Sequence, residues 1–179
     1  KTDLENGAKQ QEYRSIYEQA GYPVMFVSTY EKSGVEAVRD YLRGKTTILA
    51  GPSGVGKSSL TNLLQPEAAM ETGSISEKIK RGKHTTRHAE LFCVEEDTYL
   101  MDTPGFSSMY LEEIEPQELK DYFPEFEAYE PECRFQADCV HIGEPVCGVK
   151  AALAEGKISQ SRYDNYGLLY QELKNRRKY

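Results

Sequence analysis

The chain has 179 residues, of which 39% are hydrophobic and 28% are charged, and its formal net charge at pH 7 is −7. These values fit a globular protein with one sizeable core, and no apolar run approaches the ~18–20 residues that a membrane-spanning helix needs. The first residues also lack the basic and apolar layout of a secretory signal. The sequence therefore favours a cytoplasmic protein without a membrane partner.

The predicted elements alternate between helix and strand. In chain order, we expect a helix at 7–20, a short buried strand at 22–28, a helix at 34–44, a strand at 45–51, a helix at 57–65, strands at 88–94 and 98–103, and two helices within 148–178 that are broken near Gly156. This alternation predicts an α/β fold with a mostly parallel sheet and helices on both of its faces. The acidic, proline-rich segment 115–132 suggests a domain boundary, which we place between a first domain at 1–112 and a mainly helical domain at 113–179.

The stretch GPSGVGKSS follows the strand predicted at 45–51 and opens the helix predicted at 57–65. It matches the phosphate-binding pattern G-x-x-x-x-G-K-[ST], in which glycines let main-chain N–H groups turn toward phosphate oxygens. Lys57 is expected to reach the β- and γ-phosphates as a catalytic group, and the Ser58 hydroxyl is expected to bind Mg²⁺. The nucleotide-binding residues predicted here are Gly51, Pro52, Ser53, Gly54, Val55, Gly56, Lys57, Ser58 and Ser59.

Two further segments are expected around Mg²⁺ and the γ-phosphate. In the sequence DTPG, Asp102 ends a strand and is expected to hold Mg²⁺ through a water, while the Gly105 N–H contacts the γ-phosphate. The basic segment RGKHTTRHAEL precedes this motif, and Thr86, or else Thr85, is expected to complete the Mg²⁺ shell. Phe106 follows DTPG and cannot orient a water molecule, so another residue must position the attacking water.

The opening residues KTDL contain most of an N-K-x-D motif. The Asp3 carboxylate can accept two hydrogen bonds from the N1–H and 2-amino edge of guanine, a pattern that adenine does not offer. Lys1 would lie along the base, and Ser28 and Thr29 in the sequence VST would present main-chain N–H groups to the guanine oxygen. These residues predict GTP and GDP as ligands.

The pattern C-x5-C-x-H-x5-C, near the C-terminal end of the acidic segment, is typical of a metal site. Its predicted ligands are Cys133, Cys139, His141 and Cys147. Three thiolates and one imidazole close a tetrahedral shell, so we expect one structural Zn²⁺ ion rather than a catalytic one. The fourth cysteine, Cys93, is interpreted as a core residue of a strand.

The order of these motifs resembles that of the RsgA (YjeQ or YloQ) family, the circularly permuted GTPases of bacterial ribosome biogenesis. The base motif, VST, GPSGVGKSSL, GKHTTRHAEL, DTPGFSS and the cysteine cluster follow one another, so the guanine motif precedes the phosphate loop. The resemblance implies an OB-fold RNA-binding domain before this chain, and His84 as the residue that positions the attacking water. It also implies GTP hydrolysis in late maturation of the small (30S) ribosomal subunit, stimulated by that subunit. The protein would be a monomer that contacts rRNA through its basic segments 78–88 and 174–178.

Two other functions are compatible with the same motifs. One is an ATP-dependent P-loop enzyme such as a kinase, in which the sequence K-T-D is a coincidence. The other is a non-catalytic, zinc-dependent RNA-binding adaptor in which the metal module and the basic segments make the contacts. The complete phosphate loop and DTPG motif argue against the adaptor.

Overall fold

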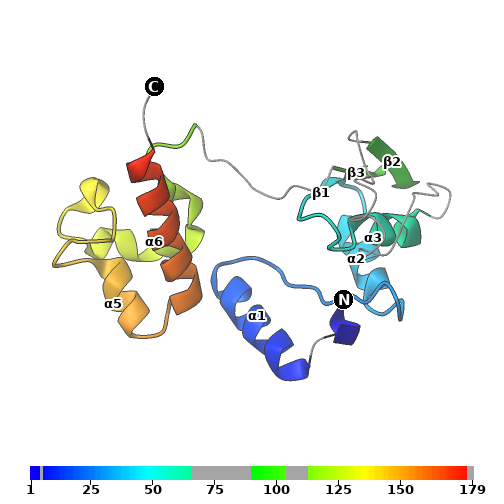
Figure 1. The fold of residues 1–179 in the computed structure, drawn as a ribbon, viewed down its shortest axis with the longest axis horizontal. Helices are drawn as coiled ribbons and strands as arrows, with labels where there is room; N and C mark the ends of the chain where they lie inside the picture. The colour runs from blue at the N-terminus through cyan, green and yellow to red at the C-terminus, as the bar shows by residue number, and fades with distance from the viewer. Residues whose placement is uncertain (5, 66–89, 104–112, 177–179) are drawn as a thin grey trace. The chain divides into compact units, whose positions relative to one another are not determined.

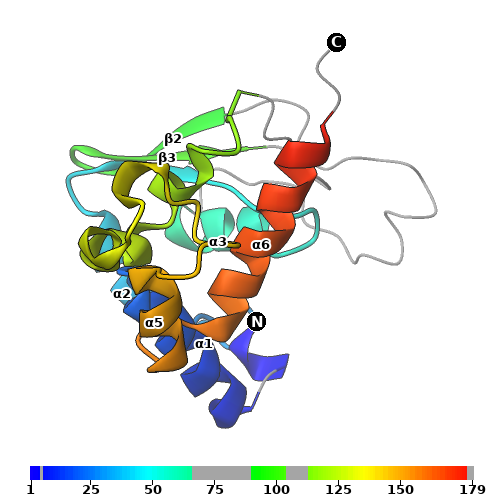
Figure 2. The ribbon, with the colours of Figure 1, turned by 90° about the vertical axis from the view of Figure 1, so that its left-hand side faces the viewer.

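The computed structural model describes residues 1–4, 6–65, 90–103 and 113–176 (Figures 1 and 2). Contacts divide the chain into two compact units, one made of 1–6 with 25–109 and the other of 7–24 with 110–179. The chain therefore leaves its first unit after residue 6 and returns to it at residue 25. In the described ranges, we find no helix that is both long enough and apolar enough to cross a membrane.

The first unit contains a three-stranded sheet in the order β1-β3-β2. Its strands are β1 (Thr46–Leu49), β2 (Glu90–Glu95) and β3 (Thr98–Asp102). The β1–β3 pair is parallel, with Leu49 opposite Asp102. The β2–β3 pair is antiparallel, because only two residues connect these strands and so short a connection forms a hairpin. The described sheet is therefore mixed rather than mostly parallel.

Two helices cover one face of this sheet. They are α2 (Val35–Leu42) and α3 (Lys57–Leu64), at the positions that the sequence predicted. Leu100 of β3 is fully buried against this face, where it joins Val35, Leu42 and Leu64 in a small core. Tyr99, the next residue back along β3, points to the opposite face and is 39% exposed. The alternation along the strand thus sets which residues meet the helices.

The prediction of a buried strand at 22–28 is wrong. Residues 22–27 form neither helix nor strand, and Ser28 makes only an isolated bridge with Ser33. A strand needs a neighbour for its main-chain groups. In the described part of the chain, the neighbour of this segment is the short stretch 1–4, where the Thr2 N–H donates to the Val27 carbonyl at 3.2 Å.

The second unit is helical. Its elements are α1 (Gly7–Gln19), η3 (Leu119–Tyr122), η4 (Pro124–Glu132), η5 (Gln136–Asp138), α5 (Gly148–Ala154) and α6 (Gln160–Asn175), where η marks a 3-10 helix. Helix α1 and the two C-terminal helices confirm the predicted ones, and Gly156 adopts a φ of 72° in the break between α5 and α6. The Gln19 side chain of α1 donates to the Gly156 carbonyl at 2.8 Å.

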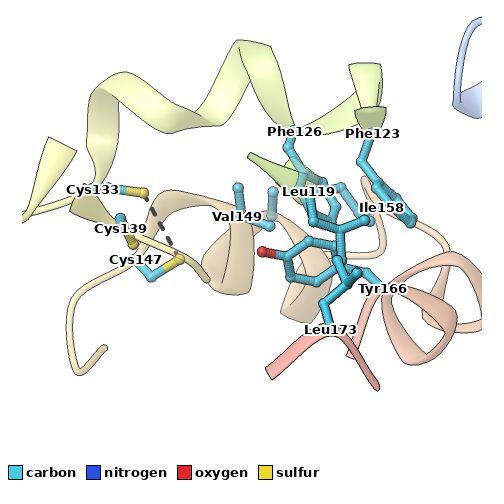
Figure 3. Close-up of a cluster of buried hydrophobic side chains, with 11 residues drawn as sticks. Leu119, Phe123, Phe126, Cys133, Cys139, Cys147, Val149, Ile158, Tyr166 and Leu173 are labelled. Carbon is cyan, nitrogen blue, oxygen red and sulfur yellow. Dashed lines mark hydrogen bonds between the residues drawn. The ribbon is translucent and has the colours of Figure 1, made fainter. Parts of the chain in front are cut away.

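Aromatic rings fill the core of this unit (Figure 3). Tyr166 of α6 is fully buried, and its ring lies edge-on to both Phe123 and Phe126 at centroid distances of 5.0 Å. Arg162 of α6 forms a two-point ion pair with the buried Glu125, with its Nε 2.6 Å from Oε1. Helix α6 is thereby fixed to η4, which leads into the cysteine cluster.

Candidate nucleotide and metal sites

The phosphate loop connects β1 to α3 and has the backbone that its glycines permit. Gly54 and Gly56 adopt φ values of 76° and 111°, in the left-handed region that other residues rarely enter. Gly56 caps α3, so the positive end of the helix faces the loop. The Lys57 Nζ atom donates to the carbonyls of Gly51 and Pro52, at 2.7 and 3.1 Å. The loop and its lysine thus form a cradle suited to phosphate.

Ser58 and Asp102 meet at the edge of this loop, as the sequence predicted. The Ser58 hydroxyl donates to Asp102 Oδ2 at 3.3 Å. Asp102 is fully buried, and its Oδ1 atom has no hydrogen-bond partner among the described residues. A buried carboxylate oxygen beside a hydroxyl is a ligand set that suits Mg²⁺, which prefers oxygen. The next residue, Thr103, donates to the Leu49 carbonyl at 2.6 Å and holds the ends of β3 and β1 together.

The base motif reaches the phosphate loop although the two are far apart in sequence. The Lys1 Nζ atom donates to the Gly54 carbonyl at 3.0 Å, with a sequence separation of 53. The Ser28 hydroxyl donates to Asp3 Oδ1 at 2.6 Å. This hydrogen bond is the main cause that lowers the pKa of Asp3, so the carboxylate stays charged.

The donor groups of Ser28 lie differently from our expectation. Its main-chain N–H donates to the Ser33 carbonyl at 3.1 Å and is therefore not available to guanine. Its side chain instead orients Asp3, and it is fully buried. Thr29 follows it in the turn between Ser28 and Ser33 and stays the predicted source of a main-chain donor.

Several predicted residues lie outside the described residues. They are Thr85, Thr86, His84, Gly105, Phe106 and the basic segment 78–88. Of the basic tail, residues 174–176 are described, and the rest is not. Their predicted roles stay predictions.

The structure brings the four predicted metal ligands together. Ligand atoms of Cys133, Cys139, His141 and Cys147 all lie within 4.8 Å of one another, and all four residues are buried. The Cys133 and Cys147 sulfurs are 3.8 Å apart (Figure 3). The His141 Nδ1 atom is 3.7 Å from the Cys133 sulfur and 3.3 Å from the Cys147 sulfur. Tetrahedral zinc with bonds of about 2.3 Å to sulfur and about 2.0–2.1 Å to nitrogen separates its ligands by about 3.6–3.8 Å. The donor set and its spacing thus fit Zn²⁺.

Burial changes the protonation of these ligands when no metal is bound. It raises the pKa of Cys139 to about 12 and raises the pKa of Cys147 as well. Burial also lowers the pKa of His141, against the opposing effect of Glu130. At neutral pH both thiols therefore hold protons that a metal ion must displace. The imidazole, by contrast, is neutral and ready to bind.

Three groups around the metal ligands were not predicted. Glu130 of η4 lies 3.2 Å from His141 Nε2. The hydroxyls of Tyr163 and Tyr166 donate to the carbonyls of His141 and Val140, each at 2.6 Å. These contacts connect elements that are distant in sequence, so no local pattern signals them.

The prediction that Cys93 lies in the core is wrong, because its side chain is on the exposed face of the sheet.

A family model described as RsgA GTPase matches residues 1–112. The chain belongs to the RsgA GTPase family. It is 62% identical, over all 179 of its residues, to the small ribosomal subunit biogenesis GTPase RsgA of Agathobacter rectalis, and covers 59% of that protein. It is 48% identical to the RsgA of Alkaliphilus metalliredigens and covers 61% of it. The chain thus spans about three fifths of the length of these relatives.

Two solved structures share the fold. YloQ, described as a circularly permuted GTPase, superimposes with a TM-score of 0.76 at 33% identity over 100% of this chain and 56% of that chain. YjeQ from Thermotoga maritima gives a TM-score of 0.75 at 37% identity over 99% of this chain and 59% of that chain. The rotated order of the base and phosphate motifs is therefore the order of a circularly permuted GTPase fold.

Proposed function

We propose that this chain binds GTP and GDP, hydrolyses GTP with Mg²⁺, and acts in late maturation of the small ribosomal subunit, which stimulates it. The observation that carries the nucleotide part is the base motif. Lys1 contacts the phosphate loop, and Asp3 is held by Ser28 with a lowered pKa. A charged carboxylate beside a phosphate cradle favours guanine over adenine.

The proposed hydrolysis depends on positioning and charge. Lys57 and the loop N–H groups would stabilise charge on the transferring phosphoryl group. Ser58 and Asp102, together with Thr86, would hold Mg²⁺, which supplies charge neutralisation between the phosphates. His84 would position the attacking water, and Gly105 would contact the γ-phosphate. The buried Asp102 Oδ1 atom, which has no hydrogen-bond partner among the described residues, supports the magnesium site, whereas the sequence motifs support the other roles.

The proposed partner is the small ribosomal subunit with its rRNA. The names of the relatives, which describe small-subunit biogenesis GTPases, support this partner. We propose that residues 1–112 carry the GTPase activity and that 113–179 form a domain stabilised by one Zn²⁺. The protein would act in the cytoplasm as a monomer, with the basic segments 78–88 and 174–178 against rRNA phosphate.

Exchange of the base-reading carboxylate tests nucleotide specificity. We expect Asp3→Asn to lower GDP affinity by about 10- to 100-fold, because it removes charge-assisted hydrogen bonds, and to improve binding of xanthosine diphosphate. Calorimetric titration with GDP, ADP and xanthosine diphosphate measures both changes. Glu36→Gln, at an exposed carboxylate on α2, is the matched control. Equal affinity of the wild type for GDP and ADP would instead support the ATP-dependent enzyme.

Turnover with and without purified small subunits tests the biological part. We expect slow GTP hydrolysis by the protein alone and a large increase when subunits are added, with the stimulation falling as salt is raised. Hydrolysis without stimulation would support the proposed GTPase activity but contradict the proposed ribosomal role. Binding to subunits without hydrolysis would support the adaptor.

A further inference from the structure

The two ring nitrogens of His141 face different partners. Nδ1 lies toward the cysteine sulfurs, 3.3 Å from Cys147 and 3.7 Å from Cys133. Nε2 lies on the other side of the ring, 3.2 Å from Glu130 Oε1. A neutral imidazole has one donor and one acceptor nitrogen. If Nδ1 binds the metal through its lone pair, the proton is on Nε2, where the carboxylate can accept it.

Glu130 is itself held in place. The Lys120 Nζ atom is 3.8 Å from the same Glu130 oxygen, and the lysine side chain is only 10% exposed. The lysine also donates to the Ala137 carbonyl at 2.7 Å, in the segment between the first two cysteine ligands. Lys120 therefore balances the charge of Glu130 and fixes the loop that supplies those ligands.

The backbone at His141 is constrained as well. His141 adopts a φ of 58°, in the left-handed region, which is unfavourable for a residue with a side chain. The tyrosine hydroxyls of α6 hold the carbonyls on either side of this bend. With the backbone fixed, rotation of the ring is the remaining freedom, and Glu130 restricts it.

We infer that Glu130 is a positioning residue of the metal site. It accepts the Nε2–H of His141 and so directs Nδ1 toward the three thiolates, while Lys120 anchors the carboxylate. The inference rests on the proposed binding of zinc by the four ligands. Outer groups of this kind change metal affinity by about 10- to 100-fold when they are removed.

Competition with a chromophoric chelator measures the affinity of the chain for Zn²⁺ and Co²⁺. We expect Glu130→Ala to weaken Zn²⁺ binding by about 10- to 100-fold. Glu130→Gln keeps an acceptor oxygen without the charge, so it should weaken binding less, and Lys120→Met should fall between the wild type and Glu130→Ala. Glu127→Gln, at an exposed carboxylate on the same η4 helix, should leave the affinity unchanged.

The protonation of the ring gives a second readout, which does not depend on the variants folding. Long-range ¹H–¹⁵N spectra of the zinc-loaded wild type should show the proton of His141 on Nε2 and the metal on Nδ1. Metal on Nε2, or unchanged Zn²⁺ affinity in Glu130→Ala, would overturn the inference. A wild-type chain that binds no Zn²⁺ would instead overturn the proposed zinc site, which the other outcomes leave intact.

Discussion

At the scale of single residues, one hydroxyl helps to keep the Asp3 carboxylate charged. The Ser28 side chain donates to Asp3 and lowers the pKa of that carboxyl. A lowered pKa keeps the carboxylate ionised to more acidic pH. Any contribution of its charge to guanine binding is therefore fully present near neutrality and is lost as the pH falls through the pKa of the folded protein.

We predict that Ser28→Ala raises the pKa of Asp3 toward the ordinary value for an aspartate. The GDP affinity of the variant should then begin to fall at a higher pH than that of the wild type. Calorimetric titrations from pH 7 downward measure this shift. Ser33→Ala is the control, because Ser33 bridges to Ser28 through its main chain. Coincident pH profiles of Ser28→Ala and the wild type would contradict the prediction.

The residues within motifs were predictable, whereas those that support them were not. The spacing of the cysteines and histidine was sufficient to find four residues that the fold brings together. Glu130 and Tyr163 contact His141 across 11 and 22 residues of sequence, and no periodic pattern connects such positions. The main-chain N–H of Ser28 was predicted to bind guanine, but it donates to the Ser33 carbonyl in a bridge that depends on a turn, which the sequence did not reveal.

At the scale of elements, the start of α5 is packed too closely for any side chain. A Cβ atom at Gly148 would lie 2.1 Å from the Tyr129 carbonyl oxygen and 2.7 Å from the Glu132 Cβ. The Gly148 N–H also donates to the Cys133 sulfur at 3.3 Å. The glycine thus allows α5 to begin directly beside Cys133, a predicted metal ligand.

We predict that Gly148→Ala destabilises the second unit by about 1–3 kcal/mol, because overpacking forces η4 away from α5. Thermal unfolding of the zinc-loaded protein measures the effect. Gly167→Ala is a matched control, since a Cβ there meets nothing within 4 Å and Gly167 lies inside α6. That control should be neutral or stabilising by up to about 1 kcal/mol. A Gly148→Ala protein as stable as Gly167→Ala would exclude the close packing.

The helices were easier to predict than the strand at 22–28. A helix satisfies its own main-chain groups, and glycines such as Gly21, Gly44 and Gly156 mark its ends in the sequence. A strand depends on a partner that its own sequence does not reveal. The hairpin between β2 and β3 shows the converse, since only two residues connect these strands and so short a connection determines their antiparallel pairing.

At the scale of the whole molecule, the second unit combines a small aromatic core with the cysteine cluster. Its buried side chains include both Tyr166 and three of the four predicted metal ligands. A core this small supplies limited stability, so a metal ion bound only in the folded state adds directly to the free energy of unfolding.

We predict that removal of the metal by a strong chelator unfolds the second unit and leaves the sheet of the first. The chain has no tryptophan and 13 tyrosines, so near-ultraviolet circular dichroism reports on packed tyrosines such as Tyr166. Its signal should collapse on chelation and return when Zn²⁺ is added, while the amides of β1 and β3 keep their protection from hydrogen exchange. A signal that survives chelation would show that the aromatic core folds without metal.

Residues 7–24 belong to the second unit although residues of the first unit precede and follow them, so neither unit can be cut out as one continuous piece of chain. Neither unit is a continuous segment, because 7–24 belongs with 110–179 and is flanked by residues of the other unit. Deletion of the C-terminal part would strip α1 and the segment after it of the partners Gly156 and Arg162 that they have there. Both ends of this segment lead directly to residues that we predict to read the base, Asp3 before it and Ser28 after it. Shortening the gene from its 3′ end would therefore remove contacts of a segment that connects these two residues, and the unit with the cysteine cluster could not be lost or exchanged as one continuous piece of chain.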